Sequence, residues 1–376
     1  MAEAAAPVNT IADDPALARL IEQVQAARAA GRRLAIQGGG TKAFYGEPLV
    51  GEPLDLRPLA GVSSYEPSEL VVTVRAGTPL AELEALLATK GQCLPFEPPR
   101  FAGAHGPGTV GGMVAAGLAG PARAAVGGVR DYVLGATLLN GKGEVLSFGG
   151  QVMKNVAGYD VSRLLAGSLG ILGAICEVSL KVLPVAPATL TLRFEIDEVA
   201  ALRRLNEWGG RPLPLSASAW WDGILVLRLA GARAAVDAAA AQLGGEVVEP
   251  ALAASFWDGL RDQRDEFFAG AVKAVEGGAA LWRIALPSVA PPLRLPGQQL
   301  IEWGGALRWV CTPVPAPQLR EAVTLAGGHA TLFRALDRSA GVFSLLSPPL
   351  ARIQRALKQS FDPDGVFNPG RLYPGL

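Results

Sequence analysis

Two short glycine-rich segments contain the residues best suited to bind a ligand through the backbone. Gly38-Gly39-Gly40-Thr41 directly follows an apolar run, and Thr109-Val110-Gly111-Gly112 follows a proline-rich stretch. In such turns successive N–H groups converge on an anion, and glycine allows close approach because it has no Cβ. The chain has 34 basic and 34 acidic residues and no basic cluster, so backbone N–H groups would have to hold a phosphate. The sequence therefore predicts a phosphate-bearing ligand at these two segments.

Three other motifs match only in part, and each is rejected on its context. Residues 106–111 satisfy G-x-G-x-x-G but follow a proline-rich loop instead of a strand, which disfavours a Rossmann site. No hydroxyl residue follows Lys42 to hold Mg²⁺, so kinase or ATPase chemistry is not indicated. Residues 166–170 resemble a nucleophile elbow but precede a strand, and the only histidines are His105 and His329. A hydrolase is therefore not expected.

Composition excludes several further classes of protein. The zero net charge offers no field for nucleic acid or an anionic bilayer, so neither is expected as a direct partner. Cys93, Cys176 and Cys311 lie far apart without C-x-x-C spacing, which argues against disulfides, zinc and an iron–sulfur cluster. With two histidines in addition, we expect no metal site. The first 14 residues do not resemble a secretory leader and no stretch resembles a membrane span, so a cytoplasmic protein is expected.

The elements around the glycine segments follow from helix caps, apolar runs and turn residues. Asp14 and Pro15 predict the start of a helix that Gly31 ends. Residues 70–74 are expected to form a buried strand and residues 80–88 a helix, a βαβ-type beginning. Asn140-Gly141 predicts a hairpin turn. The remaining expected elements are strands at 33–36, 132–139, 144–148 and 171–182, and a short helix at 161–166 behind Asp160.

The chain changes character after residue 187. Between residues 190 and 333, hairpin turns are expected at Trp221-Asp222-Gly223 and Trp303-Gly304-Gly305. Each is followed by a helical pattern, at 232–243 and 318–325, and by a further strand. This indicates two related βαββαβ halves, the second with a degraded first half. Residues 348–360 then predict an amphipathic helix that leads into a turn at 362–365.

Taken as an ordered set, the motifs resemble the FAD-binding domain of the vanillyl-alcohol oxidase and p-cresol methylhydroxylase (PCMH) family. The set consists of the two glycine segments, Arg130-Asp131, residues 154–160 and residues 167–173. Residues 94–184 and the ending at 362–370 resemble the FAD-binding E subunits of glycolate oxidase complexes. The resemblance implies an α+β protein with a two-subdomain PCMH-type FAD domain (1–187) and a ferredoxin-like antiparallel cap (188–345). A C-terminal helix and tail (346–376) would return to the FAD domain.

The resemblance also assigns the cofactor and its residues. Residues 38–41 would hold the FAD pyrophosphate, 109–112 would form a second loop around it, and residues 170–175 would pass the adenine and ribose. The FAD is expected to be non-covalent, because Thr41 stands where flavin-attaching members have a histidine. The residues implied in cofactor binding are Gly38, Gly39, Gly40, Thr41, Thr109, Val110, Gly111, Gly112, Gly170, Gly173 and Ile175.

The implied activity is oxidation of glycolate or a related small 2-hydroxy acid to the 2-oxo acid. Electrons would pass from FAD to an iron–sulfur subunit in a complex that also contains a second flavin subunit, because this chain has no cluster ligands of its own. Membrane contact would be indirect, through the complex at the inner face of the cytoplasmic membrane. The alternative is a non-catalytic flavin-binding assembly subunit whose cap is a protein interface.

Catalytic residues are not identified by the motifs. Relatives that oxidise 2-hydroxy acids use clustered histidines in the cap, whereas this cap has only His329. The cap strands instead carry arginines, which either line a solvated or interdomain face or clamp a substrate carboxylate. The candidates are Arg283, Arg308, Arg334 and His329, with Arg193 and Arg228 as further strand arginines.

Overall fold

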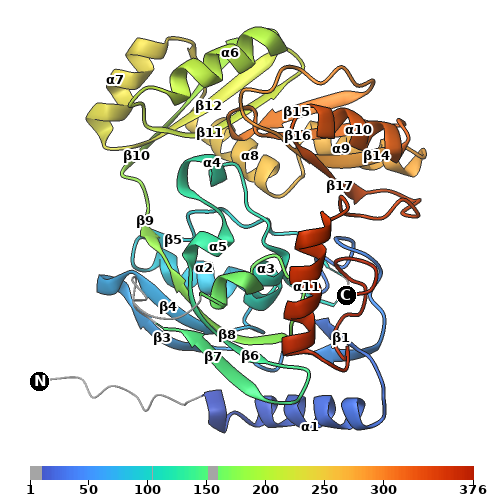
Figure 1. Cartoon of the computed structure of the whole chain (residues 1–376). Coiled ribbons are helices and arrows are strands. Elements are labelled where there is room, and N and C mark those ends of the chain that lie inside the picture. Colours follow the sequence, from blue (N-terminus) through green and yellow to red (C-terminus); the bar gives the residue numbers. More distant parts are fainter. Residues whose placement is uncertain (1–10, 104, 151–159) are drawn as a thin grey trace, which may run out of the picture.

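The computed structural model describes residues 11–103, 105–150 and 160–376. Figure 1 shows two stacked parts: the lower part contains the N-terminal half of the chain and the C-terminal segment, and the upper part contains the strands from β10 to β17. We refer to them as the FAD part and the cap. Among the helices of the described residues, none combines the length and apolarity needed to cross a membrane.

The FAD part begins with a helix and two parallel strands, α1 (Pro15–Ala29), β1 (Leu34–Gln37) and β2 (Glu52–Asp55). The predicted cap is confirmed, because the Asp14 carboxylate accepts a hydrogen bond from the backbone N–H of Ala16 at 2.8 Å. The apolar face of α1 is buried against β1 and against Val366 and Phe367 near the end of the chain. The first and last segments of the chain therefore share one core.

A five-stranded antiparallel sheet, in the order β3-β4-β8-β6-β7, forms the second layer of the FAD part. The predicted hairpin at Asn140-Gly141 joins β6 to β7. The βαβ-type beginning is wrong: β4 pairs antiparallel with β3 and β8, and the strand after α2 leaves this sheet to pair with β9. That strand, β5 (Gln92–Cys93), ends before Pro95, whose missing N–H cannot support a sheet ladder. The strand bounds are β3 Val62–Glu66, β4 Val71–Arg75, β6 Val133–Leu139, β7 Val145–Gly149, β8 Ala174–Lys181 and β9 Leu183–Pro184.

Several short helices connect these strands. The expected helix at 161–166 is a 3-10 turn, η3, where Asp160 accepts from the Ser162 hydroxyl at 2.9 Å. The other helices are η1 (Ile11–Asp13), η2 (Pro67–Glu69), α2 (Leu80–Ala88), α3 (Val110–Ala116), α4 (Arg123–Val126) and α5 (Val129–Tyr132). Leu83 and Leu87 of α2 and Val114 of α3 pack into the core beneath the five-stranded sheet.

The cap is one eight-stranded antiparallel sheet in the order β13-β10-β12-β11-β15-β16-β14-β17. The first four strands and the last four have the same order about the β11–β15 pairing, which joins Ala219 to Glu302 and Trp220 to Ile301. The second half has no helix between β14 and β15, in agreement with the degraded copy expected from the sequence. The strands are β10 Ala188–Glu195, β11 Leu215–Trp221, β12 Ile224–Gly231, β13 Glu246–Val247, β14 Ala280–Ala285, β15 Gln298–Glu302, β16 Leu307–Thr312 and β17 His329–Arg334.

Helices cover both faces of the cap sheet. On the outer face, α6 (Glu198–Gly209) and α7 (Arg233–Leu243) bury one half and α10 (Ala316–Leu325) the other. On the inner face, α8 (Pro250–Arg261) and α9 (Glu266–Glu276) share a core with Tyr45, Leu118 and Leu169 of the FAD part. A 3-10 turn, η4 (Trp303–Gly305), connects β15 to β16. The inner face of the sheet therefore meets the FAD part through a common apolar core.

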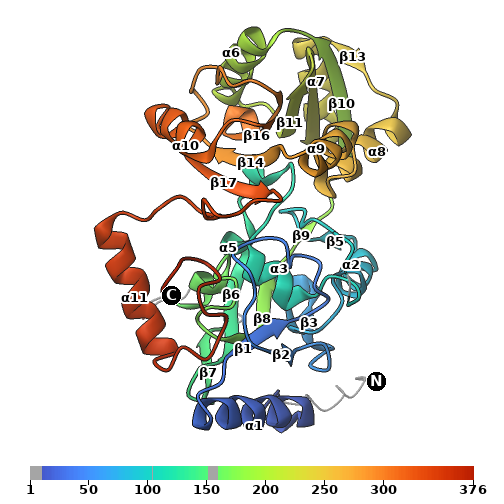
Figure 2. The same cartoon turned by 90° about the vertical axis from the view of Figure 1, so that its right-hand side faces the viewer.

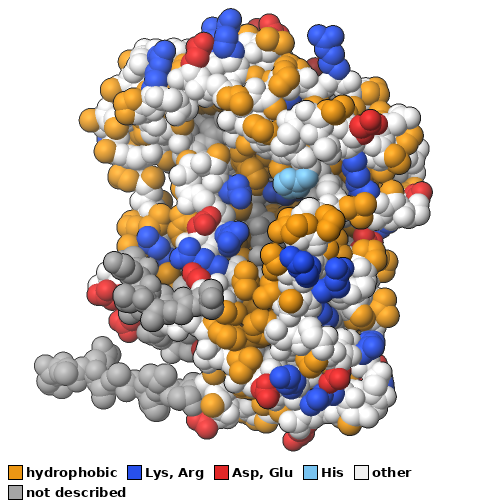
Figure 3. Space-filling model, in the orientation of Figure 1, with side chains coloured by type: hydrophobic (Ala, Val, Ile, Leu, Met, Phe, Trp, Pro, Cys, Tyr) orange, Lys and Arg blue, Asp and Glu red, His pale blue; other side chains and the backbone are white. Residues whose placement is uncertain are grey.

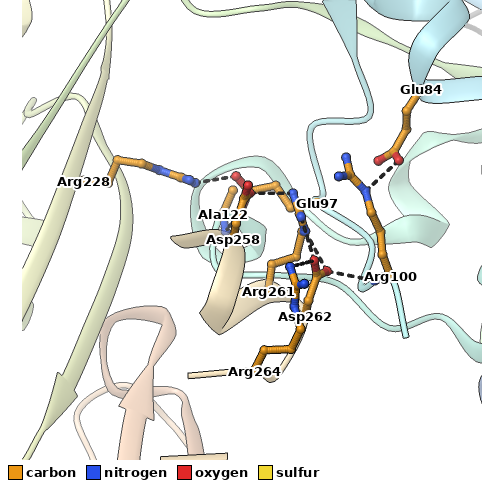
Figure 4. Close-up of polar contacts among 9 residues, drawn as sticks. All are labelled: Glu84, Glu97, Arg100, Ala122, Arg228, Asp258, Arg261, Asp262 and Arg264. Carbon is orange, nitrogen blue, oxygen red and sulfur yellow. Dashed lines mark hydrogen bonds and ion pairs between the residues drawn. The ribbon is translucent and has the colours of Figure 1, made fainter. Parts of the chain in front are cut away.

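Polar contacts add to this junction (Figure 4). The Arg228 guanidinium of β12 lies 2.7 Å from the Glu97 carboxylate of the FAD part. Asp262, which is buried, accepts from the backbone N–H of Arg100 at 2.9 Å and from Arg261 at 2.8 Å. The indole N–H of Trp303 donates to the Gly120 carbonyl at 3.0 Å. The Arg261–Asp262 bond lies within the cap, and each of the other bonds joins a cap residue to a loop of the FAD part.

The last helix, α11 (Pro348–Phe361), returns to the FAD part, and Figure 2 shows the C-terminal tail beside it. The Lys358 ammonium is buried there between the Asp362 carboxylate at 2.6 Å and the carbonyls of Ile171 and Phe367 at 2.7 and 2.8 Å. Asp362 also accepts from the backbone N–H groups of Val366 and Phe367. This buried network fixes the tail against the turn that precedes β8.

Candidate functional site

Both glycine segments line one pocket of the FAD part. The pocket has an empty volume of about 930 Å³ including its open mouth. It also receives the turn before β8 and the C-terminal tail. The residues expected to bind a cofactor all line it except Val110: Gly38, Gly39, Gly40, Thr41, Thr109, Gly111, Gly112, Gly170, Gly173 and Ile175. Val110 is fully buried in the apolar core beneath the pocket, so its side chain does not face this space.

The first glycine segment has the properties of an anion nest. It follows β1, and Gly40 has a left-handed backbone with φ of 71°. Within the described parts of the chain, none of the five backbone N–H groups of residues 38–42 donates to a protein acceptor. Five successive N–H donors that line a pocket and have no acceptor among the described residues suit an anionic ligand.

The second segment contributes in a different way from that expected. Thr109 caps α3 by accepting from the Gly112 N–H at 3.2 Å, and the N–H groups of Val110 and Gly111 donate to Thr78 and Ala76. The first N–H groups of α3 are therefore occupied within the protein. This segment shapes the wall of the pocket, whereas the donors come from residues 38–42.

Close backbone contact explains why glycine occupies these positions. A Cβ added to Gly39 would lie 1.8 Å from the Pro107 carbonyl oxygen. A Cβ on Gly111 would lie 2.6 Å from the Cβ of Ala76. Gly170, with φ of 75°, is packed against Asn368. The glycines thus bring five separate segments together around the pocket.

Lys42 provides the positive charge nearest to the nest. Its side chain lines the pocket, with the ammonium 3.3 Å from the Thr41 hydroxyl and 5.6 Å from the ring centre of Phe101. Burial lowers the pKa of Lys42 to about 8. Among the described residues no carboxylate pairs with it. An anionic ligand in the nest would supply the missing counter-charge.

The C-terminal tail completes the pocket with residues that sequence analysis did not single out. The Asn368 side chain accepts from the Ile36 N–H at 2.8 Å and donates to the Leu169 carbonyl at 2.7 Å. Arg371 also lines the pocket, but it donates to carbonyl oxygens of residues 42–47 and so supports the loop behind the nest. In the sequence, only the resemblance of residues 362–370 to the ending of the glycolate oxidase E subunits indicated a role for this tail.

The cap arginines proposed as catalytic candidates separate into different environments. Arg308 lies on the outer face of the sheet, fully buried, and donates to the carbonyls of Ala290 and Pro291 at 2.7 and 2.8 Å. Its guanidinium is engaged in holding this loop, which does not favour a role as a carboxylate clamp. Its neighbours Leu307 and Trp309 face the FAD part instead, because side chains alternate along a strand.

The other candidates lie on the inner side or at the edge. The Arg334 guanidinium stacks on Phe44 with 3.6 Å between its central carbon and the ring centre. Arg283 stacks on Trp303 at 5.2 Å and faces the FAD part. His329 is exposed at the start of β17, and the described residues contain no group of three potential metal ligands.

The two remaining strand arginines are Arg193 and Arg228. They lie on a solvated face and on the interdomain face, which are the positions expected of arginines that do not clamp a substrate. Arg193 pairs with Glu195 and Glu246 at the exposed edge of the sheet, and Arg228 pairs with Glu97 across the junction.

Of the motif at 154–160, residues 154–159 lie outside the described part of the chain. In the space-filling view, basic side chains gather around the hollow where the cap meets the FAD part (Figure 3).

Comparison with known proteins agrees with the fold. Residues 17–149 match the sequence profile of an FAD binding domain. A solved structure of alkyldihydroxyacetonephosphate synthase superposes with a TM-score of 0.61 over 93% of this chain and 75% of that chain, at 17% identity. The chain therefore has a PCMH-type FAD-binding domain joined to an α+β cap.

The sequence relatives define the family more narrowly. The chain is 49% identical over 357 residues to the glycolate oxidase subunit GlcE of Escherichia coli (strain K12), covering 95% of this chain and 97% of that protein. It is also 31% identical to the glycolate oxidase subunit GlcD of Bacillus subtilis (strain 168), over 37% of this chain and 29% of that protein. The chain belongs to the family of the GlcE subunit.

Proposed function

We propose that this chain is the FAD-binding subunit of a complex that oxidises glycolate or a related 2-hydroxy acid to the 2-oxo acid. The observation that carries the proposal is the row of five backbone N–H groups at residues 38–42, which line the pocket and find no protein acceptor among the described residues. The family relationship to GlcE over nearly the whole chain supports the substrate class. FAD supplies two-electron redox chemistry when it is bound.

The described residues suit a dinucleotide held without a covalent bond. Residues 38–42 would donate to the pyrophosphate, and the Lys42 ammonium would balance its charge. Gly170, Gly173 and Ile175 line the side of the pocket where the adenosine would pass. Thr41 is buried beside the nest and offers no nucleophile of the histidine type.

The domain division that we propose follows the sheets. Residues 1–187 would form the FAD domain and residues 188–345 the cap, with residues 346–376 returning to the FAD domain. The junction between β9 and β10 and the return at α11 are consistent with these limits.

Electron transfer beyond FAD requires a partner. The cysteines are free and separate, and burial raises the pKa of the Cys176 thiol to about 12, so it is a poor ligand or redox group. We propose an iron–sulfur subunit as the electron acceptor and a GlcD-like chain as the second flavin subunit. Any membrane contact would then be made through these partners.

A second function is favoured by the separation of two candidate residues, because Arg308 is buried on the outer face of the cap sheet and His329 is exposed at the start of β17. The chain would then bind FAD and support assembly, while a partner performs the oxidation. Anaerobic addition of glycolate to the isolated chain and to the assembled complex separates the two functions. Bleaching of the FAD of this chain by glycolate supports the catalytic function, and bleaching of the partner's flavin alone supports the assembly function. A chain that takes up no FAD would contradict both.

A further inference from the structure

A second, smaller cavity lies between the cap and the FAD part. Its empty volume is about 330 Å³ including its open side, and it is lined from both parts. Phe101, Leu118 and Gly120 come from the FAD part, and Gln263, Arg283 and Glu302 from the cap. Four polar side chains line this cavity. Arg261 is paired with Asp258 and Asp262, whereas the hydrogen-bonding groups of Gln263, Arg283 and Glu302 are only partly used.

Arg283 brings an unpaired positive charge to the cavity. It lies on β14 and packs its guanidinium against the rings of Trp303 and Trp309, with 5.2 and 6.0 Å to the ring centres. Within the described residues it has no hydrogen-bond or ion-pair partner. Burial lowers its pKa, which expresses the cost of removing this cation from water. A desolvated guanidinium with free donors is well suited to a carboxylate, which it can bind bidentately.

Glu302 provides a carboxyl group on the same wall. It is the last residue of β15 and is 5% exposed. One of its oxygens accepts from the Trp309 indole N–H at 2.7 Å, and the other has no partner in the described residues. Burial raises the pKa of Glu302 to about 8, and Asp265 and Glu97 act in the same direction while Arg283 opposes them. At neutral pH the carboxyl is therefore mostly protonated and can donate a hydrogen bond.

Gln263 adds a third group. Its side-chain amide oxygen is buried without a hydrogen-bond partner among the described residues. Its backbone is left-handed, with φ of 55°, in the turn between α8 and α9. A buried amide oxygen without a partner is unfavourable, so a ligand that hydrogen-bonds to it would remove this cost.

The cavity adjoins the cofactor pocket along the chain. Ala115 and Ala116 at the end of α3 line the larger pocket, and Leu118, Ala119 and Gly120 line the smaller cavity. One continuous segment thus lines both spaces. Gly120, whose carbonyl accepts from the Trp303 indole N–H at 3.0 Å, lines the smaller one.

We propose that this cavity is a binding site for a small 2-hydroxy monocarboxylate, with Arg283 binding the carboxylate and Glu302 and Gln263 hydrogen-bonded to the hydroxyl. The proposal rests on the proposed function, and it adds the residues that recognise the substrate. It also predicts a pH dependence of binding. When Glu302 ionises, its negative charge repels the carboxylate, so affinity falls as the pH rises.

The test is glycolate binding to the full, FAD-containing chain, measured anaerobically by calorimetry and by tryptophan emission. Arg283→Gln is expected to weaken glycolate binding at least tenfold, because a charged hydrogen-bonded partner is lost. Arg283→Lys, which keeps the charge, should weaken it less. Arg204→Gln is the matched control, since Arg204 also stacks on a tryptophan, Trp208, but is exposed on α6.

The pH profile tests Glu302 separately. In the unmodified chain the affinity should fall by up to about tenfold per pH unit above pH 8. Glu302→Gln stays uncharged, so its affinity should not change with pH in this range. Glycolate binding to Arg283→Gln with the affinity of the unmodified chain would overturn the proposal. A pH profile of Glu302→Gln that matches that of the unmodified chain would also overturn it. The FAD content of every variant is measured alongside. An unmodified chain that holds no FAD would refute the proposed function. Normal FAD content together with glycolate binding that does not depend on Arg283 would refute only this site.

Discussion

Gly39 and Pro107 lie in direct backbone contact, so that a Cβ on Gly39 would be 1.8 Å from the Pro107 carbonyl oxygen. This contact holds the loop with the free N–H groups against the loop that precedes α3. Gly39→Val is therefore expected to abolish FAD binding by forcing the two loops apart. The side chain would clash with protein backbone, and it need not enter the space of the ligand to do so. The flavin-to-protein absorbance ratio of the purified variant measures this.

Gly209→Ala is the control for the glycine prediction. Gly209 lies at the end of α6 with nothing within 4 Å of an added Cβ and without a positive φ. The FAD content of this variant should match that of the unmodified chain. Full FAD content in Gly39→Val would show that the nest is not the binding site.

The linkage of the cofactor gives a second prediction. His105 lines the pocket beside Gly40, so it is the residue from which a covalent flavin would be expected. We predict that precipitation with acid releases all yellow colour into the supernatant, both from the unmodified chain and from His105→Ala. Flavin that stays in the pellet of the unmodified chain but is released from His105→Ala would identify a covalent link at His105.

Lys42 gives a pH-dependent prediction. Burial lowers its pKa to about 8 from 10.5, so between these values the unfolded chain binds more protons than the folded one. The free energy of unfolding of the cofactor-free chain should therefore rise with pH across this window. Affinity for FAD should do the opposite above pH 8, because the pyrophosphate favours the charged lysine. Lys42→Met should remove both trends, as measured by denaturant unfolding and flavin fluorescence titration; persistence of either trend would exclude Lys42 as its source.

Asp262 tests the junction between the two parts. Burial alone would raise its pKa, but hydrogen bonds from Arg261 and from the Arg100 backbone outweigh this and lower it. Its stabilising effect is therefore present above the ordinary aspartate pKa of about 3.9 and is lost as the pH falls below it. Asp262→Asn should lower the free energy of unfolding by about 3 kcal/mol at pH 7, because it leaves buried arginine donors poorly paired.

Asp364→Asn is the comparison for Asp262. Its partner Arg28 lies 2.6 Å away, but both side chains are nearly half exposed. Such a surface pair contributes at most about 1 kcal/mol. Equal thermal shifts for the two variants would contradict the role given to the Asp262 network.

Local signals in the sequence predicted much of the fold. Asp14 and Pro15 fixed the start of α1, and Asp222-Gly223 gave the turn between β11 and β12, because caps and turns depend on neighbouring residues. The partner of β5 is β9, about 90 residues further on, and nothing local specifies it. The βαβ interpretation failed at that point.

The part of the site that the backbone forms could be predicted from the sequence. Glycine spacing located the nest at residues 38–42, whereas the occupied N–H groups of α3 depend on Thr78 and Ala76, which are distant in sequence. Arg283 and Arg308 look alike in the sequence, since each lies within a strand. Their difference depends on which face of the sheet meets the FAD part, and that is set by the packing of α8 and α9 on the inner face.

The tail that carries Asn368 and Arg371 has a consequence for the order of events during synthesis. Both residues line the same pocket as Gly38, and Leu34 of β1 forms a bridge with Phe367. The pocket therefore cannot close while the ribosome is still adding residues before 371. Nascent chains and products of early termination should lack cofactor however much FAD the cell contains, and the yellow colour becomes a marker of translation that has passed this point.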